Sequence, residues 1–118
     1  MRRKDLIGRH GEELAVRHLQ ANGFVVLARN WTCDRGEIDI VARDGDVLVV
    51  CEVKTRTGLG YGSPLEALTR EKVTRLRHLA ACWLAEHQVR PRAVRIDVVG
   101  ILRRGAAPAV IEHVRGVE

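Results

Sequence analysis

Hydrophobic residues follow two kinds of spacing along the chain. A repeat of three to four positions predicts a helix over about residues 5–22, ended by Gly23, and a second, long helix over about residues 64–88. Short apolar runs predict five strands, at about residues 24–27, 36–43, 47–55, 93–102 and 109–114. This order predicts an α/β fold in which helices flank a mixed five-stranded sheet.

The strand at residues 47–55 carries the most informative pattern. It is apolar at every position from Leu48 to Cys51, which is typical of a strand covered on both faces. Side chains two residues apart share a face of a strand. Glu52 and Lys54 therefore leave the apolar run side by side.

A second carboxylate, Asp39, lies in the preceding strand between Ile38 and Ile40. Asp44-Gly45-Asp46 predicts a tight hairpin turn between the two strands. A two-residue loop puts Asp39 and Glu52 on one face of the sheet, whereas a three-residue loop puts them on opposite faces. Two-residue loops are the commonest hairpin connection, which favours the shared face.

Two carboxylates close together at the end of a strand repel each other, so they need either a proton or a cation. Mg²⁺ binds through a few carboxylates together with waters and phosphate oxygens, and Lys54 is suited to position a water or stabilise a phosphate. Glu12, at the edge of the apolar face of the first helix, is a further candidate ligand, whereas Glu13 points away. The alternative is a structural Glu52–Lys54 ion pair with Asp39 in solvent.

Charge is distributed unevenly along the chain. Residues 1–35 hold seven basic and four acidic side chains, and residues 70–104 hold nine and three. Residues 36–69 between them hold three basic and six acidic side chains. Basic flanks suit a polyanion such as nucleic acid, and an acidic centre suits phosphate only when a metal cation is bound.

Composition excludes several classes of protein. Aromatic residues make up 3% of the chain, which argues against a platform that stacks several bases. No apolar run is long enough to span a bilayer, and the basic N-terminus leads into a helical pattern rather than a signal peptide. Three widely spaced cysteines argue against a zinc site or a disulfide framework and favour the cytoplasm.

These motifs resemble the PD-(D/E)XK nuclease superfamily, and within it the YraN-like family of small endonucleases. The resemblance covers nearly the whole chain, which we expect to be one nuclease-like domain, residues 1–118. It is carried by the following segments: Gly36-Glu37-Ile38-Asp39-Ile40, Glu52-Val53-Lys54-Thr55-Arg56, Gly11-Glu12 with Ala15, Gly23-Phe24, Asn30-Trp31 and Lys72. The proline that gives the superfamily its name is replaced here by Ile38.

The resemblance implies a restriction-endonuclease-like αβββαβ core and a DNA endonuclease that depends on Mg²⁺ or Mn²⁺. It implies that Asp39 and Glu52 bind the metal, that Glu12 adds an acidic group, and that Lys54 is the catalytic lysine. Similarity to archaeal Holliday junction resolvases indicates branched DNA and a homodimer, by analogy alone. The competing hypothesis is a nucleic-acid-binding module that keeps this fold without catalysis.

Three further cations are candidates for contact with nucleic acid. Lys72 lies within the apolar arc of the second predicted helix, where a lysine either extends to solvent or reaches the acidic site. Arg56 continues the face of Glu52 and Lys54, and Arg75 lies on the helix surface. The glycine-rich segment 58–62 is either a flap over the site or a simple connector.

Overall fold

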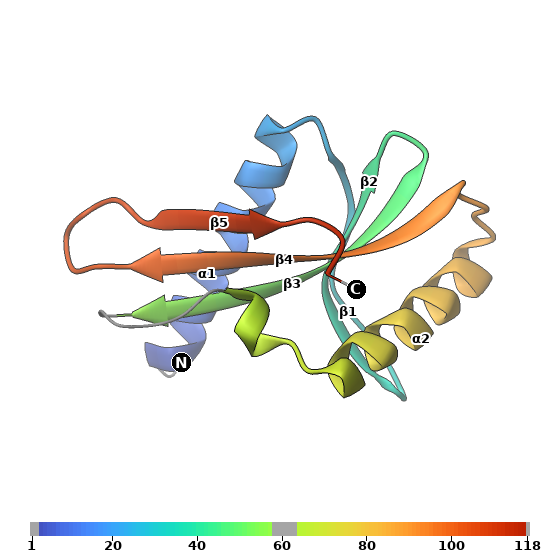
Figure 1. Cartoon of the computed structure of the whole chain (residues 1–118), viewed down its shortest axis with the longest axis horizontal. Helices are drawn as coiled ribbons and strands as arrows, with labels where there is room; N and C mark the ends of the chain where they lie inside the picture. Colours follow the sequence, from blue (N-terminus) through green and yellow to red (C-terminus); the bar gives the residue numbers. More distant parts are fainter. Residues whose placement is uncertain (1–2, 58–63, 118) are drawn as a thin grey trace.

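The computed structural model describes residues 3–57 and 64–117 (Figure 1). Its elements are, in order, α1 (Arg3–Ala21), β1 (Val25–Cys33), β2 (Gly36–Asp44), β3 (Val47–Thr57), η1 (Pro64–Ala67), α2 (Arg70–His87), β4 (Ala93–Arg103) and β5 (Val110–Val114). The predicted mixed five-stranded sheet and the αβββαβ element order are confirmed. The glycine-rich segment predicted as a flap or connector lies outside the described residues.

The strands lie in the sheet in chain order, from β1 at one edge to β5 at the other. The first three strands form an antiparallel meander, β4 runs parallel to β3, and β5 runs antiparallel to β4. Parallel neighbours require a crossover connection, and here η1 and α2 lie along it. Figure 1 shows α1 on one side of the sheet, with η1 and α2 on the other.

A hydrophobic cluster fills each face of the sheet, and β3 contributes to both. Val49 and Cys51 pack against the side of α1, whereas Leu48 and Val50 pack against the side of α2. All four residues are buried. The unbroken apolar run in the sequence is therefore explained by a central strand that is covered on both faces.

The first strand is longer than the pattern at residues 24–27 predicted, because β1 continues to Cys33. A bulge between Val26 and Ala28 shifts its pairing with β2, and Asn30 has a positive φ of 49°. An edge strand exposes one side to solvent, so polar residues are tolerated there and the apolar periodicity ends early. Pairing with β2, rather than local pattern, sets the length of β1.

The single helix predicted over residues 64–88 is also corrected. A short 3-10 helix, η1, is followed by a separate α2, whose N-cap is Thr69. The Thr69 hydroxyl accepts a hydrogen bond from the amide of Lys72 at 3.1 Å, which satisfies an otherwise unpaired donor of the first turn. The cap therefore places Lys72 in the first turn of α2.

Two further findings concern the helices and the cysteines. Within residues 3–57 and 64–117, no helix combines the length and the apolar character needed to cross a membrane. The three cysteines, Cys33, Cys51 and Cys82, are all free thiols.

Gly11 allows α1 to approach β3 closely. A Cβ atom at this buried position would collide with the Thr55 hydroxyl, whereas the space around Gly8 in the same helix is open. We expect Gly11→Ala to lower the free energy of unfolding by about 1–3 kcal/mol through overpacking. Gly8→Ala is the matched control and should raise it by about 0.5–1 kcal/mol through helix propensity. Urea unfolding curves measure both, and an equal gain in both variants would contradict the close contact.

Candidate metal and nucleic-acid site

The site lies where β2 and β3 separate. Their ladder begins at the Asp44–Val47 pair beside the hairpin turn and ends at the Ile40–Cys51 pair. Asp39 is the next residue beyond the ladder on β2, and on β3 the next residue is Glu52. From there β3 pairs only with β4, as far as Thr57. The two carboxylates therefore lie just beyond the last paired residues of β2 and β3. We call this place, defined by Asp39 and Glu52, the fork.

The hairpin register makes Asp39 and Glu52 the next opposed residues beyond the last pair of the ladder. The hairpin has the two-residue loop Gly45-Asp46, which is the register that the sequence favoured. Val41 and Val50 are paired across the strands and pack on the α2 side. Glu52 lies two residues beyond Val50 and projects to that side. Asp39 lies where alternation on β2 is broken, since Ile38 packs on the α2 side and Ile40 on the α1 side. The amide of Val53 donates a 2.8 Å hydrogen bond to Asp39 Oδ2, which links Asp39 to β3 next to Glu52.

Asp39 is in an environment that opposes its negative charge. Burial, followed by repulsion from Glu52, raises the pKa of the Asp39 carboxyl to about 7. The Val53 amide acts in the opposite direction, and Glu12 and Glu37 add smaller repulsions that raise this pKa further. Among the described residues no cationic side chain pairs with Asp39. The carboxylate is therefore poised to accept either a proton or a cation.

Glu52, in contrast, already has a cationic partner. Lys72 Nζ lies 2.9 Å from Glu52 Oε1, and the two side chains are 24% and 12% exposed. The first turn of α2 thus delivers an ammonium group to the fork, which is the inward orientation considered for Lys72. Such a shielded ion pair is held more firmly than a surface pair because little water competes for it.

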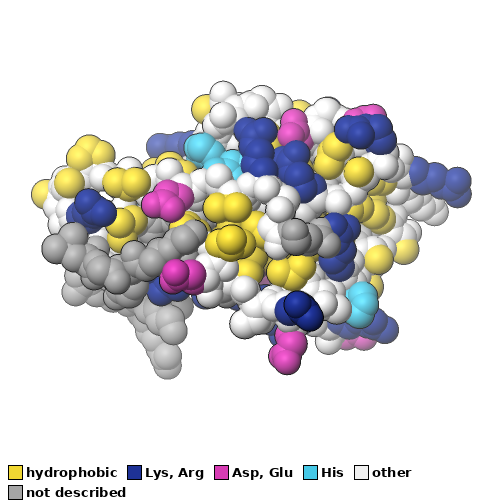
Figure 2. Space-filling model, viewed as in Figure 1, with side chains coloured by type: hydrophobic (Ala, Val, Ile, Leu, Met, Phe, Trp, Pro, Cys, Tyr) yellow, Lys and Arg dark blue, Asp and Glu magenta, His cyan; other side chains and the backbone are white. Residues whose placement is uncertain are grey.

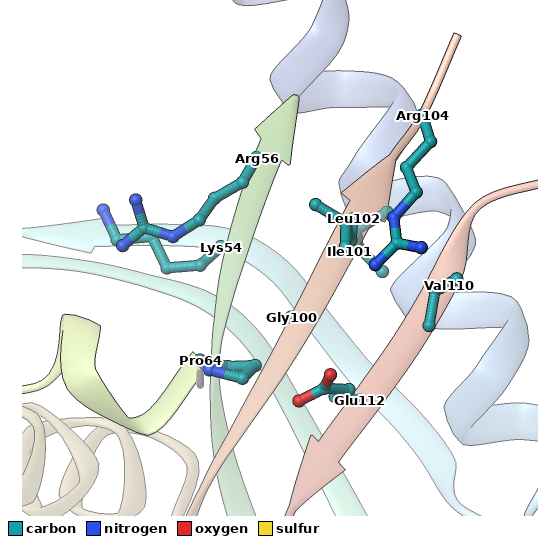
Figure 3. A pocket seen from close by; sticks show the side chains of 9 residues that line it. All are labelled: Lys54, Arg56, Pro64, Gly100, Ile101, Leu102, Arg104, Val110 and Glu112. Atoms are coloured by element: carbon teal, nitrogen blue, oxygen red, sulfur yellow. The ribbon is translucent and has the colours of Figure 1, made fainter. Parts of the chain in front are cut away.

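The remaining predicted residues surround this fork. Lys54 projects from β3 on the face of Glu52, and its head group gathers with that of Arg56 on one side of the strand (Figure 3). Glu12 is half-buried on α1, and its negative charge is close enough to raise the pKa of Asp39. Arg75 is exposed on α2 and passes beside Gly36 at the β1–β2 turn.

Glu13, the neighbour of Glu12 on α1, points away from the fork, as the sequence predicted. It forms an ion pair with Arg29 at 2.9 Å and another with Arg17 at 3.6 Å. Two adjacent glutamates on one helix therefore face different surroundings.

The fork fits a hard divalent cation, although it is not a complete protein cage. No group of three or more His, Cys, Asp or Glu side chains in the described part of the chain is arranged to hold a metal. Mg²⁺ commonly binds through one or two carboxylates and completes its shell with waters and substrate phosphate. The unpaired charge of Asp39 beside Glu52 matches that donor set.

The structure also reveals a polar chain that the sequence did not indicate. Asp97 is fully buried on the α1 side of the sheet and accepts a 2.8 Å hydrogen bond from His113 Nε2. His113 Nδ1 in turn lies 3.1 Å from His18 Nε2, so the chain joins β4, β5 and α1. These residues are far apart in the sequence, and no local spacing relates them. Asp97 lies on the opposite face from Glu52, because its partner across β3 and β4 is Cys51, which packs on the α1 side.

Fold and site together define an α/β protein with an αβββαβ core and an acidic fork at the end of its central hairpin. The profile of the family described as "Uncharacterised protein family UPF0102" matches residues 11–101. The chain belongs to this family, which confirms the YraN-like membership that the motifs indicated.

Relatives in the same family match over almost their whole length. A UPF0102 protein of Beutenbergia cavernae is 58% identical over 99% of this chain and 99% of its own. A UPF0102 protein of a Nocardioides strain is 56% identical, covering 97% and 92% of the two chains. Among solved structures, the Holliday junction resolvase Hjc of Archaeoglobus fulgidus is similar with a TM-score of 0.47 and 20% identity, covering 88% of this chain and 74% of that one.

Proposed function

We propose that this chain is a single-domain endonuclease that hydrolyses phosphodiester bonds in DNA with the help of Mg²⁺ or Mn²⁺, and that its substrates are branched or otherwise structured DNA. The observation that carries the proposal is the carboxylate pair at the fork, in which Asp39 has no cationic partner among the described residues. Three free cysteines agree with action in the reducing cytoplasm, where the DNA is.

Asp39 and Glu52 would hold the ion, with Glu12 as a further acidic group directly or through water. A bound divalent ion supplies positive charge that polarises the phosphate and makes a coordinated water more acidic. Lys54 donates hydrogen bonds to the attacking water and to the phosphate oxygens, where negative charge increases in the transition state.

Cations around the fork would bind the DNA backbone. Lys72 pairs with Glu52, Arg56 lies beside Lys54 on β3, and Arg75 extends the basic surface along α2. Contacts of this kind position the substrate without reading its sequence, so we expect affinity to fall steeply with salt. A domain of this size covers only part of a branched junction, which is why we propose a homodimer on such a substrate.

Cleavage of junction, flapped and single-stranded DNA in Mn²⁺ or Mg²⁺ tests the proposal. We expect Glu52→Gln and Lys54→Met each to lower the cleavage rate by about 100-fold or more, because each removes a group that stabilises transition-state charge. Glu12→Gln should lower the rate less. Glu13→Gln is its matched control and should cut as the wild type does, since Glu13 pairs with Arg29 away from the fork.

A non-catalytic binding module is the competing function, and the Lys72–Glu52 ion pair favours it because Lys72 already neutralises one of the two carboxylates. Calorimetry with Mn²⁺ separates the two hypotheses. A nuclease binds the ion, and Glu52→Gln weakens that binding. A binding module ignores Mn²⁺, and its DNA affinity does not change with EDTA or with Glu52→Gln, which would overturn the proposed activity.

A further inference from the structure

A small hollow lies on the same face of the sheet as the fork, towards the β5 edge (Figure 3). Its volume is about 100 Å³. It is lined by Lys54, Arg56, Pro64, Gly100, Ile101, Leu102, Arg104, Val110 and Glu112. Lys54 is thus shared between this β4–β5 hollow and the proposed catalytic group, and the two features are adjacent.

The floor of the hollow exists because β4 has no side chain at Gly100. Lys54 and Gly100 are paired across β3 and β4, and Gly100 and Glu112 are paired across β4 and β5. A Cβ atom at Gly100 would collide with Pro64, so this glycine also lets η1 rest directly on the sheet. The hollow therefore lies between Lys54 and Arg56 on β3, Pro64 on η1, and β5.

Two charged groups face the hollow. The Arg104 side chain extends over it, and the Glu112 carboxylate lies below on the β5 side (Figure 3). Neither has a hydrogen bond or ion pair with any described residue, unlike Arg95 and Arg92, which bind aspartates. The described residues thus leave the donor Arg104 and the acceptor Glu112 unpaired at one hollow. Such a pair suits a ligand that carries both hydrogen-bond acceptors and donors on its edge.

The remaining walls of the hollow are apolar. Leu102 lies on its β4 side, Pro64 at the start of η1, and Val110, which is 43% exposed, on the outer strand. On this face of the molecule, hydrophobic side chains gather over the β4–β5 end beside scattered charged side chains (Figure 2). Apolar walls with a few polar groups are typical of sites for flat, heteroatom-rich ligands.

We propose that this hollow receives one unpaired nucleobase of the substrate, next to the phosphate cut at the fork. This inference rests on the proposed function and names its substrate class: DNA with a single-stranded nucleotide beside the cleaved bond. Neighbouring strands are about 4.8 Å apart, so the hollow lies roughly 10 Å or less from the fork, within reach of an adjacent nucleotide. Lys54 and Arg56 would hold the connecting backbone between the two places.

The head groups of Lys54 and Arg56 point to the side of β3 away from β4, so Arg104 and Glu112 are the charged groups at the hollow itself (Figure 3). This pair of opposite charges favours a base over a bare phosphate. The Glu112 carboxylate repels an anion but accepts hydrogen bonds from the amino groups that bases carry, while Arg104 donates to their carbonyl and ring nitrogen acceptors. A hollow this small has no room for a base pair. A base inside a duplex cannot enter it, because the base would first have to leave its partner and its stacked neighbours.

Binding in EDTA tests this inference without any need for cleavage. Fluorescence anisotropy would compare a single-stranded oligonucleotide and a flapped duplex with a blunt duplex of the same length. Val110→Trp fills the hollow from an exposed position, so the protein should still fold. We expect it to weaken binding of the single-stranded and flapped DNA by about fivefold, and to leave the blunt duplex unchanged. Val25→Trp on the opposite edge, where Val25 is 45% exposed, is the matched control and should bind as the wild type does.

Arg104→Ala provides a second variant, with Arg43→Ala beside the hairpin turn as a control for the loss of one positive charge. Arg104→Ala should narrow the preference for unpaired DNA, whereas Arg43→Ala should keep it. Wild-type affinity of Val110→Trp for single strands, or equal loss on all three DNAs, would overturn the inference. If the preference depends on Val110 but no DNA is ever cut, the hollow stands and the nuclease proposal fails.

Discussion

Asp39→Asn will make the metal-free protein more stable above pH 7 and will remove its thermal response to Mn²⁺. The wild-type carboxylate is buried beside Glu52, and its pKa is raised to about 7. Asparagine keeps the acceptor for the Val53 amide and removes the charge. We expect a gain of about 2 kcal/mol in the free energy of unfolding at pH 8, since part of the penalty for burying a polar group remains.

The pH dependence of this gain follows from the direction of the pKa shift. The pKa of Asp39 is higher in the folded protein than in the unfolded chain, where it is about 4. Protonation of Asp39 therefore stabilises the fold, and this contribution is fully present below about pH 4. That stability is lost as the pH rises towards 7. The advantage of Asp39→Asn should therefore be absent at pH 4, increase up to about pH 7 and level off above it. Urea unfolding across this range measures the change.

Mn²⁺ should stabilise the wild type but not the variant. An ion present at 100 times its dissociation constant stabilises the wild type by about 2.7 kcal/mol, and it should leave Asp39→Asn almost unchanged. Asp34→Asn, in the exposed β1–β2 turn, is the matched control and should keep the wild-type response. Equal Mn²⁺ stabilisation of all three proteins would show that the ion binds elsewhere.

Asp97→Asn will destabilise the protein by about 3 kcal/mol. The Asp97 carboxylate is 0% exposed and is bound by Arg95, by His113 and by the Gly116 amide. The substitution removes the charge that these donors surround and leaves the Arg95 cation without its nearest counter-ion, which is costly in a shielded site. Because this network ties β5 and the chain beyond it to β4, we expect the C-terminal strand to lose protection in hydrogen exchange as well.

The acid side of the stability profile should change with this variant. Burial raises the pKa of the Asp97 carboxyl, but its hydrogen bonds outweigh burial and hold this pKa below the usual range. A lowered pKa contributes stability above pH 4 that is lost as the pH falls through the folded value, so Asp97→Asn should flatten acid unfolding. Asp46→Asn is the control, since Asp46 pairs with Arg92 in solvent and each side chain is 68% exposed. A loss as large for Asp46→Asn as for Asp97→Asn would refute the special role of the buried group.

Local pattern was sufficient for the central hairpin and insufficient at its edges. The apolar run from Leu48 to Cys51 and the turn around Gly45 are short-range signals, and the structure has the strands and the register that they favoured. The length of β1 depends on pairing with β2, and the start of α2 depends on the Thr69 cap after a 3-10 turn. Both features depend on contacts with other segments or on a cap, and the spacing of apolar residues within one segment carries no information about these.

Alternation and turn chemistry are local properties of the chain, and they were enough to predict the order of helices and strands and the face shared by Glu52 and Lys54. The family was indicated by the resemblance of the motifs. The end of the β2–β3 ladder just before Asp39 and the ion pair of Lys72 with Glu52 became visible only in the folded chain. The same holds for the hollow that Arg104 and Glu112 both face. It also holds for the hydrogen-bonded chain from Asp97 through His113 to His18. These arrangements join residues distant in sequence through burial and strand pairing, which is why no spacing along the chain could predict them.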